Sequence, residues 1–84
     1  AEADLQSAAD RERILEVLET LSDALRLPLM LRDGDGFTYE EIAAQLHISL
    51  SAVKMRIKRG REEFRRRFAA IARDERASYP LEGP

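Results

Sequence analysis

The chain has 84 residues, no cysteine and a formal net charge of −2. This length allows one small domain, which buries about 60% of the surface of its unfolded chain. The absence of cysteine excludes disulfides and thiolate metal sites, and it fits a reducing cytoplasm. No stretch approaches the roughly 20 apolar residues that a membrane span needs, so we expect no membrane partner.

The beginning of the chain is expected to be irregular. Its first ten residues hold three carboxylates and no apolar run, unlike a signal peptide. Because the chain starts at Ala1 without methionine, we expect a fragment or a processed product. Residues 1–6 are expected to fray, and Ser7 is expected to cap a first helix. The predicted buried stripe of that helix consists of Ile14, Val17, Leu18 and Leu21.

A second helix is expected to begin after Ser22, a residue type that favours the N-cap position. The residues that follow are apolar on nearly all sides, which places this helix at the centre of a bundle. Pro28 lies inside it and would cost about 3 kcal/mol in a regular helix interior. Either the helix kinks at Pro28, or it restarts there with Pro28 in its first turn.

The segment Asp-Gly-Asp-Gly at residues 33–36 is typical of a turn that ends this helix. It is similar to the start of an EF-hand calcium loop. That loop then requires an oxygen ligand at Phe37 and a glutamate at Ala44, and the sequence has neither. We therefore predict no metal site, and no other cofactor is indicated.

A helix-turn-helix is predicted next. Thr38 and Glu41 have the spacing of a capping box at the start of a short amphipathic helix. A three-residue turn follows, in which His47 is expected to adopt a left-handed conformation. Ser49 is the expected cap of a long helix that begins at about Leu50 and continues past Phe68 towards Arg73. A turn this short makes the two helices cross steeply.

The long helix divides into an apolar and a basic face. Its apolar stripe, at helical spacing, consists of Val53, Ile57, Gly60, Phe64, Phe68 and Ile71. The opposite face carries Met55, Lys58, Arg59, Glu62, Arg65 and Arg66. A helix that inserts into the major groove needs this division, although a solvated helix laced with salt bridges shows the same pattern. The capped helix and tight turn before it favour DNA.

The charge distribution supports an electrostatic footprint for DNA. Residues 1–50 hold four arginines and eleven carboxylates, a net charge of −7. Residues 51–76 hold ten basic and four acidic residues, a net charge of +6. An acidic body that carries one basic helix indicates an aimed contact surface rather than general adhesion to nucleic acid.

No catalytic site is indicated. Glu40 and Glu41 are adjacent on a helix, so their side chains point about 100° apart. His47 has no second histidine, nucleophile or glycine-rich phosphate loop to work with, and a turn residue is the better interpretation. We therefore predict that the protein is not an enzyme.

Three segments resemble region four of bacterial sigma factors, and the extracytoplasmic-function group fits best. They are residues 36–43 (GFTYEEIA), Leu46 with Ile48 and Ser49, and residues 52–59 (AVKMRIKR). Leu21, Arg26 and the Leu31–Arg32 pair lie where that family's upstream helix, with the pattern LP…R…LR, would place them. Without the resemblance, Arg26 is interpreted as a surface residue paired with a nearby carboxylate. Ser22 replaces the family's usual proline, and His47 replaces its glycine.

The resemblance implies a fold, a function and a set of contact residues. The fold is an all-α bundle of four helices with a C-terminal helix-turn-helix and a long recognition helix. The function is recognition of the upstream (minus thirty-five) promoter element as part of RNA polymerase holoenzyme. The implied DNA-binding residues are Ser49, Ser51, Lys54, Met55, Arg56, Lys58 and Arg59.

The implied partners are double-stranded promoter DNA, the flap region of core RNA polymerase and an anti-sigma factor. The predicted domain spans residues 1–76, and residues 77–84 are a flexible tail. Two alternatives stay open. One is a response-regulator-type helix-turn-helix, which has a similar core but a separate, short fourth helix. The other is a protein-interaction module whose basic face meets an acidic partner.

Overall fold

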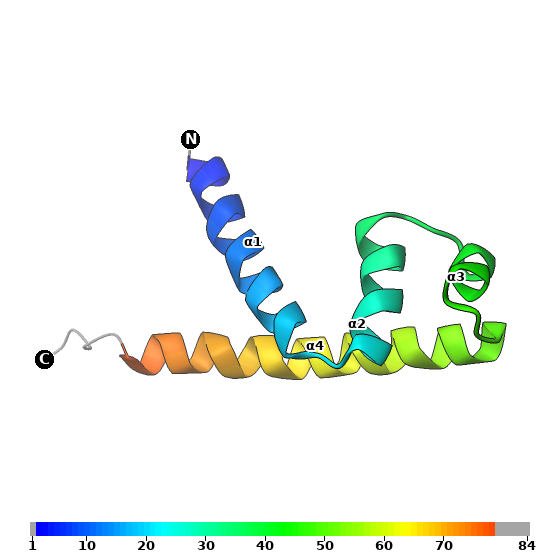
Figure 1. Ribbon diagram of the computed structural model, residues 1–84. Coiled ribbons are helices and arrows are strands. Elements are labelled where there is room, and N and C mark those ends of the chain that lie inside the picture. Colours follow the sequence, from blue (N-terminus) through cyan, green and yellow to red (C-terminus); the bar gives the residue numbers. More distant parts are fainter. Residues whose placement is uncertain (1, 79–84) are drawn as a thin grey trace, which may run out of the picture.

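The computed structural model describes the backbone of residues 2–78 and the side chains of residues 8–74. This part of the chain is built of helices and contains no strand, which confirms the predicted all-α class. Figure 1 shows the arrangement. The elements are α1 (Glu2–Thr20), α2 (Asp23–Leu29), the π-helical turn η1 (Met30–Gly34), α3 (Tyr39–Leu46) and α4 (Leu50–Ser78).

The long helix α4 is the element against which the other helices pack. α1, α2 and α3 all contact α4, and they lie on the same side of it (Figure 1). α3 is seen nearly end-on beside the start of α4, while α4 lies across the view, so their axes cross steeply. This confirms the crossing predicted from the three-residue turn.

The core lies on the side of α4 that faces the shorter helices. Ile42 of α3 is fully buried and packs against Val53 and Ile57 of α4. Further along α4 the rings of Phe64 and Phe68 stack with their centroids 5.8 Å apart, and both are half-buried. The apolar stripe predicted for the long helix is therefore its buried side.

The first helix begins earlier than predicted. α1 starts at Glu2, so Ser7 lies inside the helix and is not its cap. Residues 2–6 include Glu, Ala, Leu and Gln, whose helix propensities are high, and this extends the helix through the segment expected to fray. At the other end of α1, the buried residues Val17 and Leu21 join the core as predicted.

The second helix begins at its predicted N-cap, Ser22, whose backbone is extended. Pro28 is buried inside α2, and Met30 keeps right-handed helical angles of φ −65° and ψ −40°. The helix therefore does not restart at Pro28, and that alternative is wrong. The chain continues into η1, where the Asp35 amide donates to the carbonyl of Met30, five residues back, at 3.1 Å. This wider turn brings Asp33 against α4.

At the end of the chain, α4 continues to Ser78, past the predicted end near Arg73. Ala77 and Ser78, which we assigned to the tail, are helical. The rest of the predicted tail, residues 79–84, lies outside the described residues, so the division at residue 76 stays a prediction. None of the helices described has both the length and the hydrophobicity to cross a membrane.

Candidate nucleic-acid interface

The helix-turn-helix is built from local hydrogen bonds that the sequence signals. The Glu41 amide donates to Thr38 Oγ1 at 3.0 Å, and the Thr38 amide donates to Glu41 Oε1 at 2.8 Å. This capping box fixes the start of α3. At its end, His47 is left-handed with φ 57° and ψ 45°, as predicted. The Ile48 amide then donates to the Ala43 carbonyl at 3.1 Å, which turns the chain sharply towards α4.

The left-handed turn leads to a test. We expect His47→Gly to raise the free energy of unfolding by up to about 1 kcal/mol, because a left-handed conformation costs a residue with a Cβ about 1–2 kcal/mol and costs glycine little. Glycine's greater freedom in the unfolded chain offsets part of this gain. Thermal unfolding measures it. His47→Ala keeps the Cβ and is the control, for which no gain is expected; a fall in Tm for His47→Gly would contradict the prediction.

The first turn of α4 is fixed by Ser49. The Ala52 amide donates to Ser49 Oγ at 3.1 Å, and the Val53 amide donates to the Ser49 carbonyl at 3.0 Å. These bonds confirm the prediction that Ser49 caps α4. Its hydroxyl hydrogen is not used by this bond and can still be donated to an anion at the helix start.

The predicted contact residues gather on one side of α4. Met55 and Lys58 lie opposite the buried residue Val53 at about 100° per residue. Arg56 is half-buried at the flank of this surface. The other predicted residues are exposed: Ser49, Ser51, Lys54, Met55, Lys58 and Arg59. Among the described residues, none of the four basic side chains of this set makes an ion pair. The four cations in roughly the first three turns of α4 are therefore not paired within the described part of the chain. We call the seven predicted residues the basic surface: Ser49, Ser51, Lys54, Met55, Arg56, Lys58 and Arg59.

Three basic residues further along α4 differ, because carboxylates of the domain pair with them. Arg61 donates two hydrogen bonds to Asp33, at 3.0 and 2.6 Å, and these bonds lower the pKa of the Asp33 carboxyl. Arg66 pairs with Glu63, which lowers the pKa of that carboxyl, and Arg67 bonds the same carboxylate at 3.2 Å. The sequence placed these arginines on or beside the cationic face; the structure shows that Arg61, Arg66 and Arg67 pair with carboxylates of the domain.

Two further arginines act within the fold. Arg32 lies 4.9 Å from the ring centroid of Tyr39 and donates to the Phe37 carbonyl at 2.9 Å, which ties the end of η1 to the start of α3. Arg26 pairs with Asp23, three residues before it, as expected of a surface residue with a nearby carboxylate.

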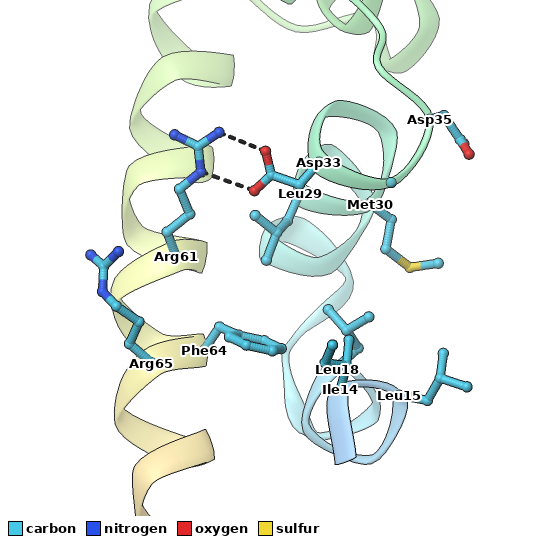
Figure 2. Close-up of a pocket in the computed structure, with 11 residues that line it drawn as sticks. Ile14, Leu15, Leu18, Leu29, Met30, Asp33, Asp35, Arg61, Phe64 and Arg65 are labelled. Atoms are coloured by element: carbon cyan, nitrogen blue, oxygen red, sulfur yellow. Dashed lines mark hydrogen bonds and ion pairs between the residues drawn. The ribbon is translucent and has the colours of Figure 1, made fainter. Parts of the chain in front are cut away.

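An apolar pocket of about 650 Å³ opens between α1, η1 and α4. Figure 2 shows Ile14 and Leu18 of α1 facing Phe64 of α4 across it. Ile14, which we predicted to be buried, is 40% exposed, and Leu15 is 52% exposed. The prediction for Ile14 was wrong, because α1 leans away from α4 (Figure 1) and leaves this side chain on the pocket wall.

The recognition helix does not break. α4 runs from Leu50 through Arg59 and Phe68 as one helix. The response-regulator alternative required a separate, short fourth helix after the recognition helix. The structure therefore disagrees with that alternative.

Comparison with known proteins agrees with this geometry. A family model described as "Sigma-70, region 4" matches residues 11–64, which contain α3, the turn, about the first half of α4 and the basic surface. The chain is 40% identical over 52 residues to the ECF RNA polymerase sigma-E factor of Escherichia coli K12, covering 62% of this chain and 27% of that protein. It is also 40% identical over 63 residues to the ECF RNA polymerase sigma factor SigE of Mycolicibacterium smegmatis, covering 75% of this chain and 21% of that protein.

The chain thus spans about a quarter of the length of these relatives, at the shares of 27% and 21%. No solved structure gives a significant match. The family match covers well over half of the chain and includes every residue of the resemblance in the helix-turn-helix. The chain belongs to the sigma-70 region 4 family, as its helix-turn-helix residues predicted.

Proposed function

We propose that this chain is the promoter-recognition domain of an alternative sigma factor of the extracytoplasmic-function group. It binds the upstream (minus thirty-five) promoter element through the start of α4, as part of RNA polymerase holoenzyme. The observation that carries the proposal is the basic surface: its four basic side chains make no ion pair among the described residues, and Lys58 and Arg59 lie opposite the buried stripe of a helix held by a helix-turn-helix turn. This is the arrangement that presents one helix to the major groove.

Each part of the basic surface has a chemical role in this proposal. Arg59 offers paired donors to a guanine edge, and Lys58 offers a point charge to guanine or phosphate. Met55 is 46% exposed and offers apolar contact to a thymine methyl group. The residues at the helix start and flank, which contact phosphate and fix the register, are Ser49, Ser51, Lys54 and Arg56. Glu62 ends the footprint because a carboxylate repels phosphate.

The protein partners are part of the same proposal. The names of the relatives describe RNA polymerase sigma factors, so core RNA polymerase is the expected partner of this domain. We assign the apolar pocket to a partner of this kind, either the polymerase flap or an anti-sigma factor, because its apolar walls lie exposed on the side of α4 opposite the basic surface and stay accessible when that surface holds DNA. Such a complex works in the cytoplasm and requires no catalytic group of this chain.

The experiment is Arg59→Ala, tested in the full-length protein with core polymerase by selecting bound sequences from random duplexes. We expect a loss of about 1–3 kcal/mol in discrimination at one base pair, because paired hydrogen bonds to guanine are removed. Arg73→Ala is the matched control, since Arg73 is exposed on the same helix about 21 Å further along.

The other outcomes are equally informative. A uniform loss across all sequences makes Arg59 a phosphate contact. No loss at all removes α4 from the groove and favours the alternative of a basic face that meets an acidic protein.

A further inference from the structure

Arg61 is the first basic residue of α4 after the basic surface, and it forms an ion pair with Asp33. It lies two residues after Arg59 and three after Lys58, on the flank of α4 that also carries Lys54. Its distance from the start of α4 is about 16 Å along the axis. The major groove is about 12 Å wide. When the first turns of α4 lie in the groove, Arg61 is therefore at the height of the phosphates that border the groove.

The Arg61 guanidinium is turned away from that position by Asp33. Arg61 Nε donates to Asp33 Oδ2 at 3.0 Å, and Arg61 Nη2 donates to Oδ1 at 2.6 Å, a parallel two-bond pair (Figure 2). The residues are 28 apart in sequence, and η1 places the carboxylate against α4. Asp35, in the same turn, points away from Arg61 (Figure 2).

The pair is exposed enough for competition. The Arg61 side chain is 41% exposed and that of Asp33 is 46% exposed, so solvent and salt screen their attraction. A phosphate offers the guanidinium the same two-acceptor geometry as the carboxylate. Arg61 can therefore bind one or the other, but not both with its two-bond face.

We propose that Asp33 withholds Arg61 from the DNA backbone and so limits the phosphates that this domain contacts. The inference rests on the proposed function. Asp33 acts as an internal competitor that lowers binding to all sequences equally. Base readout by Arg59 and Met55 does not depend on Arg61, so the withheld contact lowers the overall affinity and leaves the discrimination between sequences unchanged.

The test compares Asp33→Asn with Asp35→Asn in this chain. Both variants remove one negative charge from the same turn, but only the first releases Arg61. Fluorescence anisotropy on a labelled random-sequence duplex, between about 50 and 200 mM salt, gives affinity and salt slope. We expect Asp33→Asn to bind about threefold to tenfold more tightly than Asp35→Asn, with a log–log slope steeper by about 0.9.

Arg61 itself completes the design. In the double variant Asp33→Asn with Arg61→Gln, the slope should return to that of Asp35→Asn. Circular dichroism shows which variants fold. If Asp33→Asn does not fold, Asp33→Ser replaces it, because serine has no carboxylate to pair with Arg61, and the same steeper slope is expected.

Three results would overturn the inference. Equal slopes for the Asp33 and Asp35 variants show that Arg61 gains no phosphate. A shallower slope for Arg61→Gln alone shows that Arg61 already contacts DNA in the unmodified chain. Absence of binding by both the unmodified chain and Asp33→Asn at the lowest salt shows that releasing Arg61 adds no measurable phosphate contact, whereas the proposed function is tested separately by Arg59→Ala with core polymerase.

Discussion

Replacing Ile42 by alanine is expected to lower the free energy of unfolding by about 2–5 kcal/mol. Ile42 has no exposed surface and packs between Val53 and Ile57, with half-buried side chains around it. The substitution removes buried apolar atoms and leaves a cavity that two crossed helices cannot close. Small domains have only about 5–15 kcal/mol in total, so α3 and the turn would lose much of their support.

Thermal unfolding followed by circular dichroism measures this effect, and a fall in Tm of at least about 10 °C is expected for a domain of this size. Ile14→Ala is the matched control, because it is the same chemical change at a side chain that is 40% exposed on the pocket wall. We expect a loss below about 1 kcal/mol there. Similar losses at the two positions would show that the core does not centre on α3.

Gly60→Val is expected to be the second most damaging change, with a loss of about 3 kcal/mol. A Cβ at Gly60 would lie 3.2 Å from the Leu25 carbonyl oxygen and 3.6 Å from Leu29 Cδ2. Valine also adds two methyl groups beyond this Cβ, at a point where α4 packs closely against Leu25 and Leu29 of α2. Valine would therefore push α2 away from α4 and open the core beside it.

Urea unfolding measures the change, and Gly34→Val is the control. Gly34 has no heavy atom within 4 Å of the position of a Cβ, so the same side chain can be added there without contact. An effect within about 0.5 kcal/mol is expected for an exposed position of this kind. If Gly60→Val is equally mild, α2 is held to α4 less closely than the structure shows.

The helix-turn-helix could be predicted from sequence because its signals are local. The capping box joins Thr38 and Glu41, three residues apart, and the left-handed turn depends on the φ of His47 alone. The cap of α4 depends on Ser49 and the amides just after it. The exposed position of the basic surface follows from helical spacing once the buried stripe is recognised. Fold class, family and the exposure of most of the predicted DNA-binding residues were therefore accessible before the structure.

The contacts that could not be predicted join residues far apart in sequence. Arg61 meets Asp33 across 28 residues, and Arg67 donates to the Thr20 carbonyl at 2.6 Å across 47 residues. Periodicity places such arginines on a face, but it does not reveal which carboxylate or carbonyl reaches them. The exposure of Ile14 depends in the same way on the angle at which α1 leaves α4 (Figure 1).

The length of α4 has a consequence for how the domain can be occupied. α4 has 29 residues and is about 43 Å long, and it carries both the basic surface and one wall of the apolar pocket. Phe64 lies nine residues after Met55, hence about 13 Å further along and on the opposite side of the helix. A duplex at the first turns and a protein in the pocket would therefore approach from different directions without collision. Because both sites lie on one helix, α4 would then fix the distance between the two bound partners and their relative orientation.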